Sequence, residues 1–341
     1  MRRKILFLFP SSSMGGEQRW LATLAPRLDR LGFEVRIIFN RGHRSDFFYH
    51  LLEKYAIPEA CYWAPDWRHF HERYPEVIAE ALAAYRPDVL IVDRAEALHD
   101  VFKQPQLDYK PKVVFVCHTM EMAMINQIRQ IDELIDEVVA VSNRIAELID
   151  WRPVHVIWNG VEKPQAIPGF DVRKLLGIPE RAEVVGFMGR VDANKRPSWV
   201  IEAAKRCGYW SLIIGRGAIV PKLKEMAATT TKFIPTEVWF PGNWYQAMTR
   251  FVLASMHEGF GLVPIEALLY DVPVYVTRVG DLPNIFGDTI RYFDSLQELI
   301  GLLRQSPYDI RPARAIIEEK LSPERMAKAY ARLFEGQASY P

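Results

Sequence analysis

Short apolar runs rich in Val and Ile recur along the first half of the chain and predict strands buried on both faces. Between them, Leu21, Leu24, Leu28 and Leu31 recur at helical spacing, and Pro26 is expected to kink that helix or remove a hydrogen bond. The predicted strands are residues 5–9, 35–39, 89–92, 113–117, 138–141 and 154–158. Strands that alternate with helices are typical of a parallel α/β sheet.

The same pattern restarts after a segment rich in proline and glycine. Residues 162–171, with Pro164, Pro168 and Gly169, predict an interdomain linker. A last helix, 322–334, has Ser322 as its N-cap and Pro323 at its first position. The strands predicted for the second half are residues 184–188, 212–214, 238–240, 251–254 and 274–277, and its helices are 198–206, 221–227, 262–269 and 296–304.

Two doubly wound, Rossmann-like α/β domains that face one another are therefore expected. The N-terminal domain would span residues 1–163 and the C-terminal domain residues 164–320. Residues 321–341 would form a C-terminal helix that crosses back to the N-terminal domain. Ligands of open α/β sheets bind at the carboxyl ends of strands, so a ligand is expected in the cleft between the domains.

Composition narrows the class of protein. A length of 341 residues exceeds one typical core, and a net charge of +1 gives no reason to expect nucleic-acid binding. Three cysteines without a Cys-x-x-Cys pair indicate neither a disulfide framework nor a zinc site. The basic N-terminus precedes only five apolar residues, too few for a signal peptide, and no run approaches the roughly 18 residues that span a bilayer. A cytoplasmic location is expected.

The most informative motif is Glu258-Gly-Phe-Gly-Leu-Val-Pro-Ile-Glu266. Two glycines flank Phe260 in a turn, and an apolar helix is predicted to begin just after Gly261. A helix N-terminus offers free N–H groups to a phosphate, and carboxylates accept strong hydrogen bonds from sugar hydroxyls. The motif can therefore hold a phosphorylated, polyhydroxylated ligand.

Three other segments follow predicted strands. Arg190 and Lys195 lie in the loop after residues 184–188 and could bind phosphate, or could simply form a solvated basic loop. Gly15 and Gly16 let a ligand approach a helix start, or form an ordinary βα turn. His118 ends the strand 113–117, where it could contact a sugar or acceptor, or bond locally.

Together these motifs resemble the retaining glycosyltransferases of family 4, which have the GT-B fold. The resemblance covers essentially the whole chain, and the joint order of the motifs is more specific than any one of them. It rests on Gly15-Gly16, His118, Val141-Ser142, Asn159-Gly160-Val161, Gly189-Arg190 with Lys195 and Ile201-Glu202-Ala203, and Glu258-Gly-Phe-Gly-Leu262 with Glu266-Ala267.

The resemblance implies a role for each matched residue. Glu258 would bind hydroxyls of the donor sugar, and Glu266 the ribose of the nucleotide. The diphosphate would be held by Arg190 and Lys195. Phe260, Gly261 and Leu262 would present backbone N–H groups to the sugar or diphosphate, Gly16 would lie near the diphosphate from the other domain, and His118 would lie near the transferred sugar and the acceptor.

The reaction implied is transfer of a hexose-type sugar from a nucleoside diphosphate to an acceptor hydroxyl, with retention. Arg190 and Lys195 would stabilise the charge that grows on the leaving diphosphate. The sequence contains no Asp-x-Asp, a common metal–diphosphate motif, so no metal or other cofactor is expected. The acceptor base is unassigned, and His118 is a candidate by position only.

Some positions depart from the family pattern. Asp281 and Asn284 stand where the family has a glycine and a glutamate, which puts a ligand role for that loop in doubt, and His257 replaces a small residue. An aromatic and basic cluster at 62–74 could stack on a sugar acceptor or touch a membrane surface, or could pack on its own domain.

The hypothesis is a glycosyltransferase with a nucleotide-sugar donor and a glycan, lipid-linked or small-molecule acceptor. Within the same fold, a nucleotide-sugar epimerase or a phosphorolytic enzyme is the alternative. A non-catalytic sugar-nucleotide-binding module is a second class, against which the intact Glu258, Glu266, Arg190 and Lys195 argue. A dinucleotide-dependent dehydrogenase lacks its glycine fingerprint here.

Overall fold

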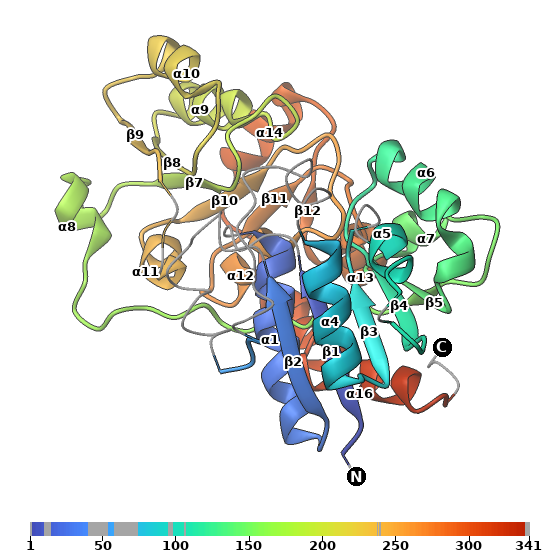
Figure 1. The fold of residues 1–341 in the computed structure, drawn as a ribbon. Helices are drawn as coiled ribbons and strands as arrows, with labels where there is room; N and C mark the ends of the chain where they lie inside the picture. The colour runs from blue at the N-terminus through green and yellow to red at the C-terminus, as the bar shows by residue number, and fades with distance from the viewer. Residues whose placement is uncertain are drawn as a thin grey trace. The chain divides into compact units, whose positions relative to one another are not determined.

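The computed structural model describes residues 2–9, 15–39, 54–57, 74–94, 98–105, 107–236, 238 and 240–337. These residues form two compact units. Unit 1 contains Met1–Gly160 together with Pro323–Pro341, and unit 2 contains Val161–Ser322. Each unit is an α/β structure built on a six-stranded sheet (Figure 1).

The sheet of unit 1 is parallel throughout, with the strand order β2-β1-β3-β4-β5-β6. All four residues of β3 are buried, as expected where helices cover both faces of a sheet. The strands are β1 (Lys4–Phe9), β2 (Glu34–Phe39), β3 (Val89–Val92), β4 (Lys112–Cys117), β5 (Glu137–Ala140) and β6 (His155–Val156). The helices are α1 (Gly16–Arg30), α4 (Pro75–Tyr85), α5 (Leu98–Phe102), α6 (Met122–Gln130), η1 (Asp132–Leu134), α7 (Asn143–Ala146) and α16 (Pro323–Phe334).

The sheet of unit 2 is also parallel, with the order β12-β11-β10-β7-β8-β9. Its strands are β7 (Val184–Met188), β8 (Trp210–Ile214), β9 (Thr231–Ile234), β10 (Arg250–Leu253), β11 (Val274–Val276) and β12 (Arg291–Tyr292). Its helices are α8 (Val172–Leu176), α9 (Pro197–Cys207), α10 (Val220–Met226), α11 (Pro241–Gln246), α12 (Leu262–Leu268), α13 (Leu282–Phe286), η2 (Gly287–Thr289), α14 (Leu296–Leu303) and α15 (Arg311–Lys320).

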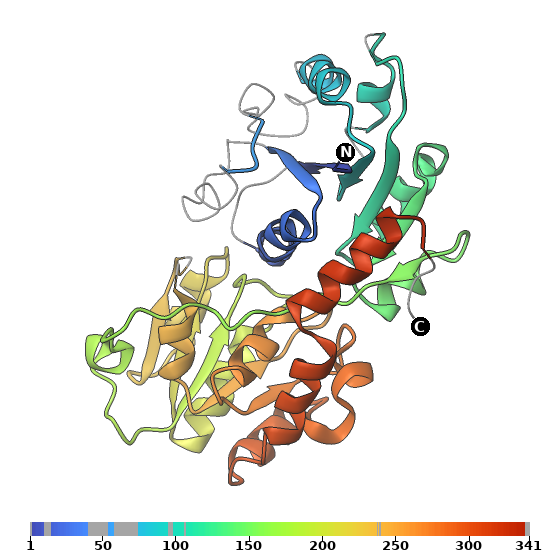
Figure 2. The ribbon, with the colours of Figure 1, turned by 90° about the horizontal axis from the view of Figure 1, so that it is seen from below.

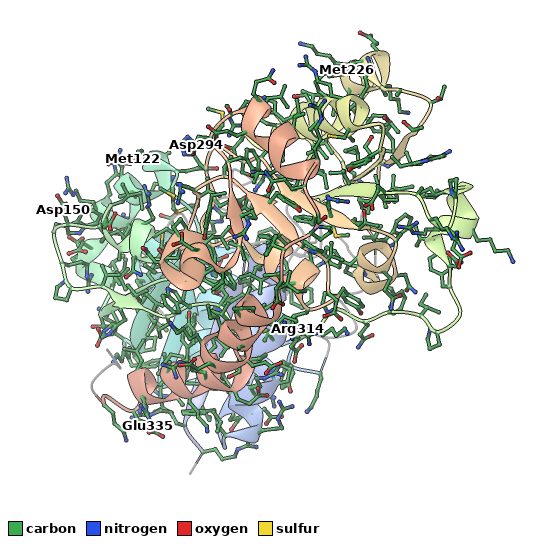
Figure 3. All side chains as sticks on the ribbon, turned by 180° about the vertical axis from the view of Figure 1, so that it is seen from behind. Met122, Asp150, Met226, Asp294, Arg314 and Glu335 are labelled. Atoms are coloured by element: carbon green, nitrogen blue, oxygen red, sulfur yellow. The ribbon has the colours of Figure 1, made fainter. Side chains whose placement is uncertain are left out.

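One face of this second sheet forms a core with two helices. Phe187 and Ile213 of the sheet belong to one cluster with Val200 of α9 and Leu299 of α14. Arg314, labelled in Figure 3, lies on α15, which contacts α12 and α13. It forms an ion pair with Asp271, after α12. The removal of apolar side chains from water is the main force that holds α9 and α14 on the sheet.

The C-terminal helix α16 completes unit 1. It packs beside α1 (Figure 2). The Trp20 and Tyr330 rings lie 5.8 Å apart between their centroids. Arg27 Nε of α1 lies 3.0 Å from Glu324 Oε1 of α16. The apolar residues of α16 lie on one side of the helix, and this side is buried within unit 1.

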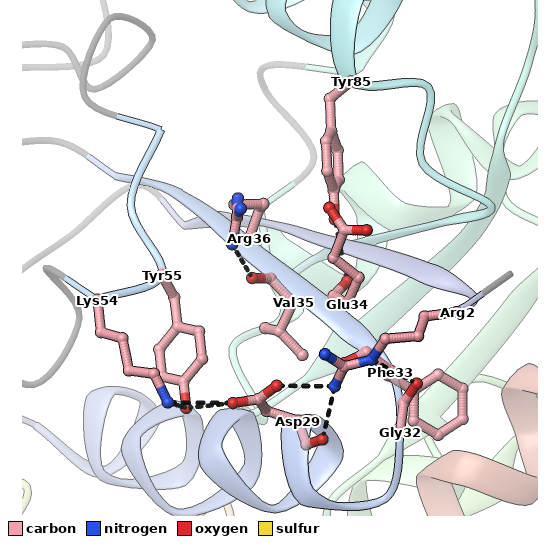
Figure 4. Close-up of polar contacts among 10 residues, drawn as sticks. All are labelled: Arg2, Asp29, Gly32, Phe33, Glu34, Val35, Arg36, Lys54, Tyr55 and Tyr85. Atoms are coloured by element: carbon pink, nitrogen blue, oxygen red, sulfur yellow. Dashed lines mark hydrogen bonds and ion pairs between the residues drawn. The ribbon is translucent and has the colours of Figure 1, made fainter.

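A polar network closes the end of α1. Asp29 accepts hydrogen bonds from Arg2 Nη2 at 2.9 Å and from Lys54 Nζ at 3.1 Å (Figure 4). Arg2 also donates to the Phe33 carbonyl at 2.7 Å, and Tyr55 O–H donates to Asp29. These contacts connect the start of β1, the α1–β2 turn and the short segment 54–57.

Several predicted elements differ from the observed ones. The strand predicted at 238–240 is wrong: Val238 and Phe240 are not in a strand, and the edge strand is β9 instead. Neither β12 nor α15 is among the predicted elements. Pro26 lies inside α1, and the helix continues through it although Pro26 has no N–H to donate to the preceding turn. Among the described residues, no helix is both long and apolar enough to cross a bilayer.

Candidate functional site

The sheet of unit 2 contains a topological switch point. From β7 the chain proceeds to β8 and β9 on one side, and β10, the other neighbour of β7, proceeds to β11 and β12 on the opposite side. In open α/β sheets the crevice at the carboxyl ends of two such strands is where ligands bind. The loops after β7 and β10 therefore border the candidate site.

Lys195 and Glu258 meet at this switch point. Lys195, before α9, donates from Nζ to Glu258 Oε1 at 2.6 Å, and Ser255 Oγ donates to the same oxygen at 2.6 Å. The side chains are only 16% and 12% exposed, so the ion pair is largely removed from water. A cation and a carboxylate thus stand together where a charged, hydroxylated ligand would enter.

Arg190, in the same loop as Lys195, is held far less firmly. Its side chain is 74% exposed, and its Nε lies 3.4 Å from Asp192 Oδ2. Asp192 Oδ1 accepts a hydrogen bond from Lys195 N at 3.0 Å, so this carboxylate shapes the loop. A long, exposed guanidinium can reach a phosphate without breaking a buried contact.

Backbone geometry fixes the turn that precedes α12. Gly261 has a φ of +100°, which favours glycine, and α12 begins at the next residue, Leu262. Phe260 is buried, and a Cβ on Gly280 would stand 2.5 Å from the Phe260 carbonyl oxygen. The first N–H groups of α12 therefore follow a turn that is held by close backbone packing.

Glu266 lies on α12 and is 3% exposed. Its Oε2 accepts a hydrogen bond from Tyr245 O–H at 2.7 Å, and Tyr245 itself is fully buried on α11. A buried carboxylate needs such a donor to offset its desolvation. Tyr245 thus fixes one oxygen of Glu266.

His118 lies in unit 1, directly after β4. Its ring packs edge-on against Trp20 with centroids 4.8 Å apart, and its Nε2 is covered and has no hydrogen-bond partner among the residues that the structure describes. Burial, with repulsion from Arg94, lowers the pKa of His118 to about 3. The imidazole is therefore neutral at physiological pH, and with so low a pKa it is a weak proton acceptor, which favours a hydrogen-bonding role over a role as general base.

The glycine pair of unit 1 lies at the start of α1. Gly15 is the N-cap with an extended backbone, and Gly16 is the first, exposed helical residue. Glu17 in the first turn pairs with Arg94, after β3, at 3.3 Å. Residues 10–14, which precede the glycine pair in the expected βα turn, lie outside the described residues, as does the aromatic and basic cluster except for Tyr74.

The loop that departs from the family pattern is built into the fold of unit 2. Asp281 is fully buried at the N-cap of α13, and Asn284 donates from Nδ2 to Asp281 Oδ1 at 3.1 Å. These two side chains thus bond each other.

The sequence motifs do not point to Asn194 or Ser255, which bind the segment around Glu258. Asn194 donates to the carbonyl of His257, which is 63 positions away in the sequence, and Ser255 donates to Glu258 across a tight turn. The described residues contain no group of three or more His, Cys, Asp or Glu that could hold a metal ion.

Family models match both halves of the chain. The Glycosyltransferase Family 4 model matches residues 14–163, and the Glycosyl transferases group 1 model matches residues 170–337. A lipopolysaccharide core biosynthesis mannosyltransferase of Rhizobium meliloti (strain 1021) is 32% identical over 164 residues, which cover 42% of this chain and 46% of that protein. A D-inositol 3-phosphate glycosyltransferase of Corynebacterium urealyticum is 31% identical over 158 residues, covering 38% and 36%. The chain thus spans less than half the length of these curated relatives.

Solved structures resemble the whole chain. HepE of Anabaena, in complex with UDP and glucose, has a TM-score of 0.79 at 19% identity and covers 98% of this chain and 100% of its own. A sucrose-phosphate synthase of Thermosynechococcus elongatus has a TM-score of 0.77 at 15% identity and covers 98% and 99%. The likeness confirms the predicted fold, and with both family models matched, the chain belongs to the family 4-type glycosyltransferases of GT-B fold.

Proposed function

We propose that the protein transfers a sugar from a nucleoside-diphosphate sugar to an acceptor hydroxyl. The observation that carries the proposal is the contact between Lys195 and Glu258 at the switch point of unit 2, with Glu266 on the helix that follows. A diphosphate needs cations, and sugar and ribose hydroxyls need strong acceptors. The family to which the chain belongs supports the same activity.

Each side chain has a proposed task in the reaction. Glu258 binds hydroxyls of the donor sugar, and Glu266 binds the ribose. When the bond between the anomeric carbon and the diphosphate oxygen breaks, its electron pair leaves with the diphosphate, and Arg190 and Lys195 stabilise that charge. The acceptor oxygen bonds to the anomeric carbon, and its proton passes to the departing diphosphate, which carries the electron pair of the broken bond. Backbone N–H groups of Phe260, Gly261 and Leu262 would assist at the sugar or diphosphate.

The proposal includes three finer properties. The anomeric configuration is retained, because the resemblance is to retaining enzymes. No metal takes part, because fixed cations can neutralise the leaving group. Unit 1 receives a glycan, lipid-linked or small-molecule acceptor, with His118 and Gly16 near the reacting groups, and the reaction takes place in the cytoplasm.

A ligand screen tests the donor part of the proposal. Thermal unfolding with UDP, GDP, ADP and TDP sugars should reveal one nucleotide that raises the melting temperature, because a ligand of the native state stabilises it. Nucleoside diphosphate should then be released only when an acceptor is added, in EDTA as well as in its absence. NMR of the product should show the anomeric configuration of the donor.

Other outcomes would replace this function. Epimerised donor without acceptor would indicate an epimerase, and a phosphate requirement would indicate a phosphorolytic enzyme. Donor binding without turnover, with any acceptor or water, would indicate a binding module. Complete loss of activity in EDTA, restored by a divalent cation, would refute the metal-free mechanism.

A further inference from the structure

One side-chain amide connects the two loops that carry the charged pair. Asn194 Oδ1 accepts a hydrogen bond from His257 N at 3.1 Å, and Asn194 Nδ2 donates to His257 O at 3.0 Å. The backbone adds a third bond, from Met256 N to Asn194 O at 2.8 Å. Asn194 therefore pairs with the 256–257 backbone as a neighbouring strand would, although neither segment is in a sheet.

The chemistry of this contact requires an amide. The His257 N–H can only donate and the His257 carbonyl can only accept, which fixes the orientation of the Asn194 side chain. A carboxylate would place a second acceptor against the His257 carbonyl, and a hydroxyl would span only part of the distance. The contact therefore depends on one residue type.

Asn194 precedes Lys195, and His257 precedes Glu258. The contact thus holds together the backbone at the base of both charged side chains, which are 63 positions apart in the sequence. Other contacts work within each loop: Asp192 accepts from Lys195 N, and Ser255 donates to Glu258. Arg196, which follows Lys195, donates from Nε to Ala254 O at 2.6 Å and from Nη2 to Ser255 O at 3.3 Å, just after β10. The Asn194 amide is the side chain that bonds the backbone directly before Glu258.

We infer that Asn194 is a positioning residue, which sets the separation of Lys195 and Glu258 so that one ligand is held by both. The inference rests on the proposed function, in which Lys195 binds the diphosphate and Glu258 the sugar. Reactive geometry tolerates about 0.5 Å of error, and a misplacement of about 1 Å can cost on the order of 100-fold in rate. The loss of Asn194 would therefore reduce turnover without removing any group that touches the ligand.

Unit 2 contains a matched control for this contact. Asn243 on α11 accepts from Ile167 N at 2.7 Å and donates to Ile167 O at 2.9 Å and Phe170 O at 3.0 Å. The chemistry is the same, but this amide fixes the segment 167–170 rather than the switch point. A change of either asparagine to aspartate replaces its Nδ2 donor by an oxygen and adds one negative charge, so the two substitutions are chemically identical.

The test compares Asn194→Asp with Asn243→Asp in the full-length protein. For Asn194→Asp, kcat/KM for the donor identified by the screen should fall at least tenfold, with most of the loss in kcat. Its affinity for the corresponding nucleoside monophosphate should stay within twofold of the wild type, because Glu266 is unchanged. Asn243→Asp should keep kcat/KM within twofold at a temperature where both variants are folded. Asn194→Ser, whose hydroxyl spans only part of the distance and adds no charge, should also lose kcat/KM, and a loss in both variants would show that the added charge is not its cause.

Two results would overturn the inference: an unchanged kcat/KM in Asn194→Asp, or an equal loss in Asn243→Asp. Amide hydrogen exchange gives a readout that does not depend on activity. The His257 amide should exchange at least tenfold faster in Asn194→Ala, which removes the oxygen that accepts from it, while the Ile167 amide should not change. Unchanged exchange at His257 would refute the contact itself. A wild type without any turnover would refute the proposed function, whereas the exchange comparison would still decide the role of Asn194 in joining the loops.

Discussion

At the scale of residues, the candidate donor site consists of charges that satisfy one another before any ligand arrives. Lys195 and Glu258 are mostly shielded from solvent, and each neutralises the charge of the other. Removing either partner would leave an uncompensated, partly buried charge, which is costly. A ligand that binds both must therefore replace their mutual contact with equally strong ones.

The Glu266 carboxylate should contribute to nucleotide affinity. In the proposed site, Glu266→Ala would remove charged hydrogen bonds to the ribose worth roughly 1.5–3 kcal/mol each, so the dissociation constant of the free nucleotide should rise on the order of tenfold or more. Isothermal titration calorimetry measures this change. Tyr245→Phe is the comparison, because it removes the donor to Glu266 Oε2 but keeps the carboxylate, so its loss of affinity should be smaller. An unchanged affinity in Glu266→Ala would refute the assignment.

His118 should make unit 1 less stable in mild acid. Its pKa falls from 6.5 to about 3 on folding, so the unfolded chain binds more protons between those values. The stability from this group is thus present above about pH 6.5 and decreases as the pH falls, by about 2 kcal/mol at pH 5. Urea unfolding at pH 7 and pH 5 measures it. In His118→Phe the additional loss should be absent, and an equal loss in both proteins would contradict the pKa argument.

At the scale of elements, the loops after β7 and β8 are packed through their backbones. A Cβ on Gly215 would lie 1.8 Å from the Gly189 carbonyl oxygen, and a Cβ on Gly217 would lie 1.8 Å from the Val191 carbonyl oxygen. Val191 N also donates to Arg216 O at 2.7 Å. The loop after β7, which carries Arg190, therefore packs directly against the backbone of the loop after β8. At Gly215 and Gly217 this contact leaves no room for a side chain.

Two glycine substitutions should have opposite effects on stability. Gly217→Ala should destabilise the protein by about 1–3 kcal/mol, because the methyl group collides with backbone that cannot rotate away. Gly301→Ala should stabilise it by about 0.5–1 kcal/mol, because Gly301 is an exposed residue inside α14 with nothing within 4 Å of its added Cβ. Chemical denaturation of both variants measures this difference. A tolerated alanine at position 217 would contradict the close backbone approach.

The central strands and the main site motif could be predicted from the sequence, but the edges of the sheet and the contacts between loops could not. Buried strands such as β3 and β7 are continuous apolar runs, which are recognisable alone. The edge strand β9 contains Lys232, and β12 contains Arg291, because an edge is partly solvated. Asn194 contacts His257 because β7 and β10 are neighbours in the sheet. The local pattern of apolar and polar residues does not reveal the order of the strands.

At the scale of the whole molecule, the chain order and the structural units do not coincide. Unit 2 is one continuous segment, whereas unit 1 needs α16 from the far end of the chain. Trp20 lies against Tyr330, and Phe33 packs edge-on against Phe334 with centroids 6.0 Å apart. Part of the hydrophobic core of unit 1 therefore comes from residues that follow unit 2 in the sequence.

Fragments should reveal this difference. Residues 161–322 expressed alone should fold cooperatively and keep nucleotide binding, because the sheet of unit 2 is complete and Arg190, Lys195, Glu258 and Glu266 are all present. Residues 1–160 alone should unfold at a lower temperature than unit 1 does in the full chain, since the α1 face that α16 covers would be exposed. Circular dichroism melting measures both. A peptide of residues 323–337 should restore stability to the 1–160 fragment, and no effect of the peptide would contradict the assignment of α16 to unit 1.

The position of α16 has a consequence for biosynthesis. Residues 1–160 leave the ribosome first, but the helix that packs on α1 is made after all of unit 2. A nascent chain that has just reached Ser322 can hold a finished second domain while Trp20 still lacks its contact with Tyr330. The domain that begins first would be completed last, and until then its open apolar face is a place where chaperones can bind or neighbouring chains can aggregate.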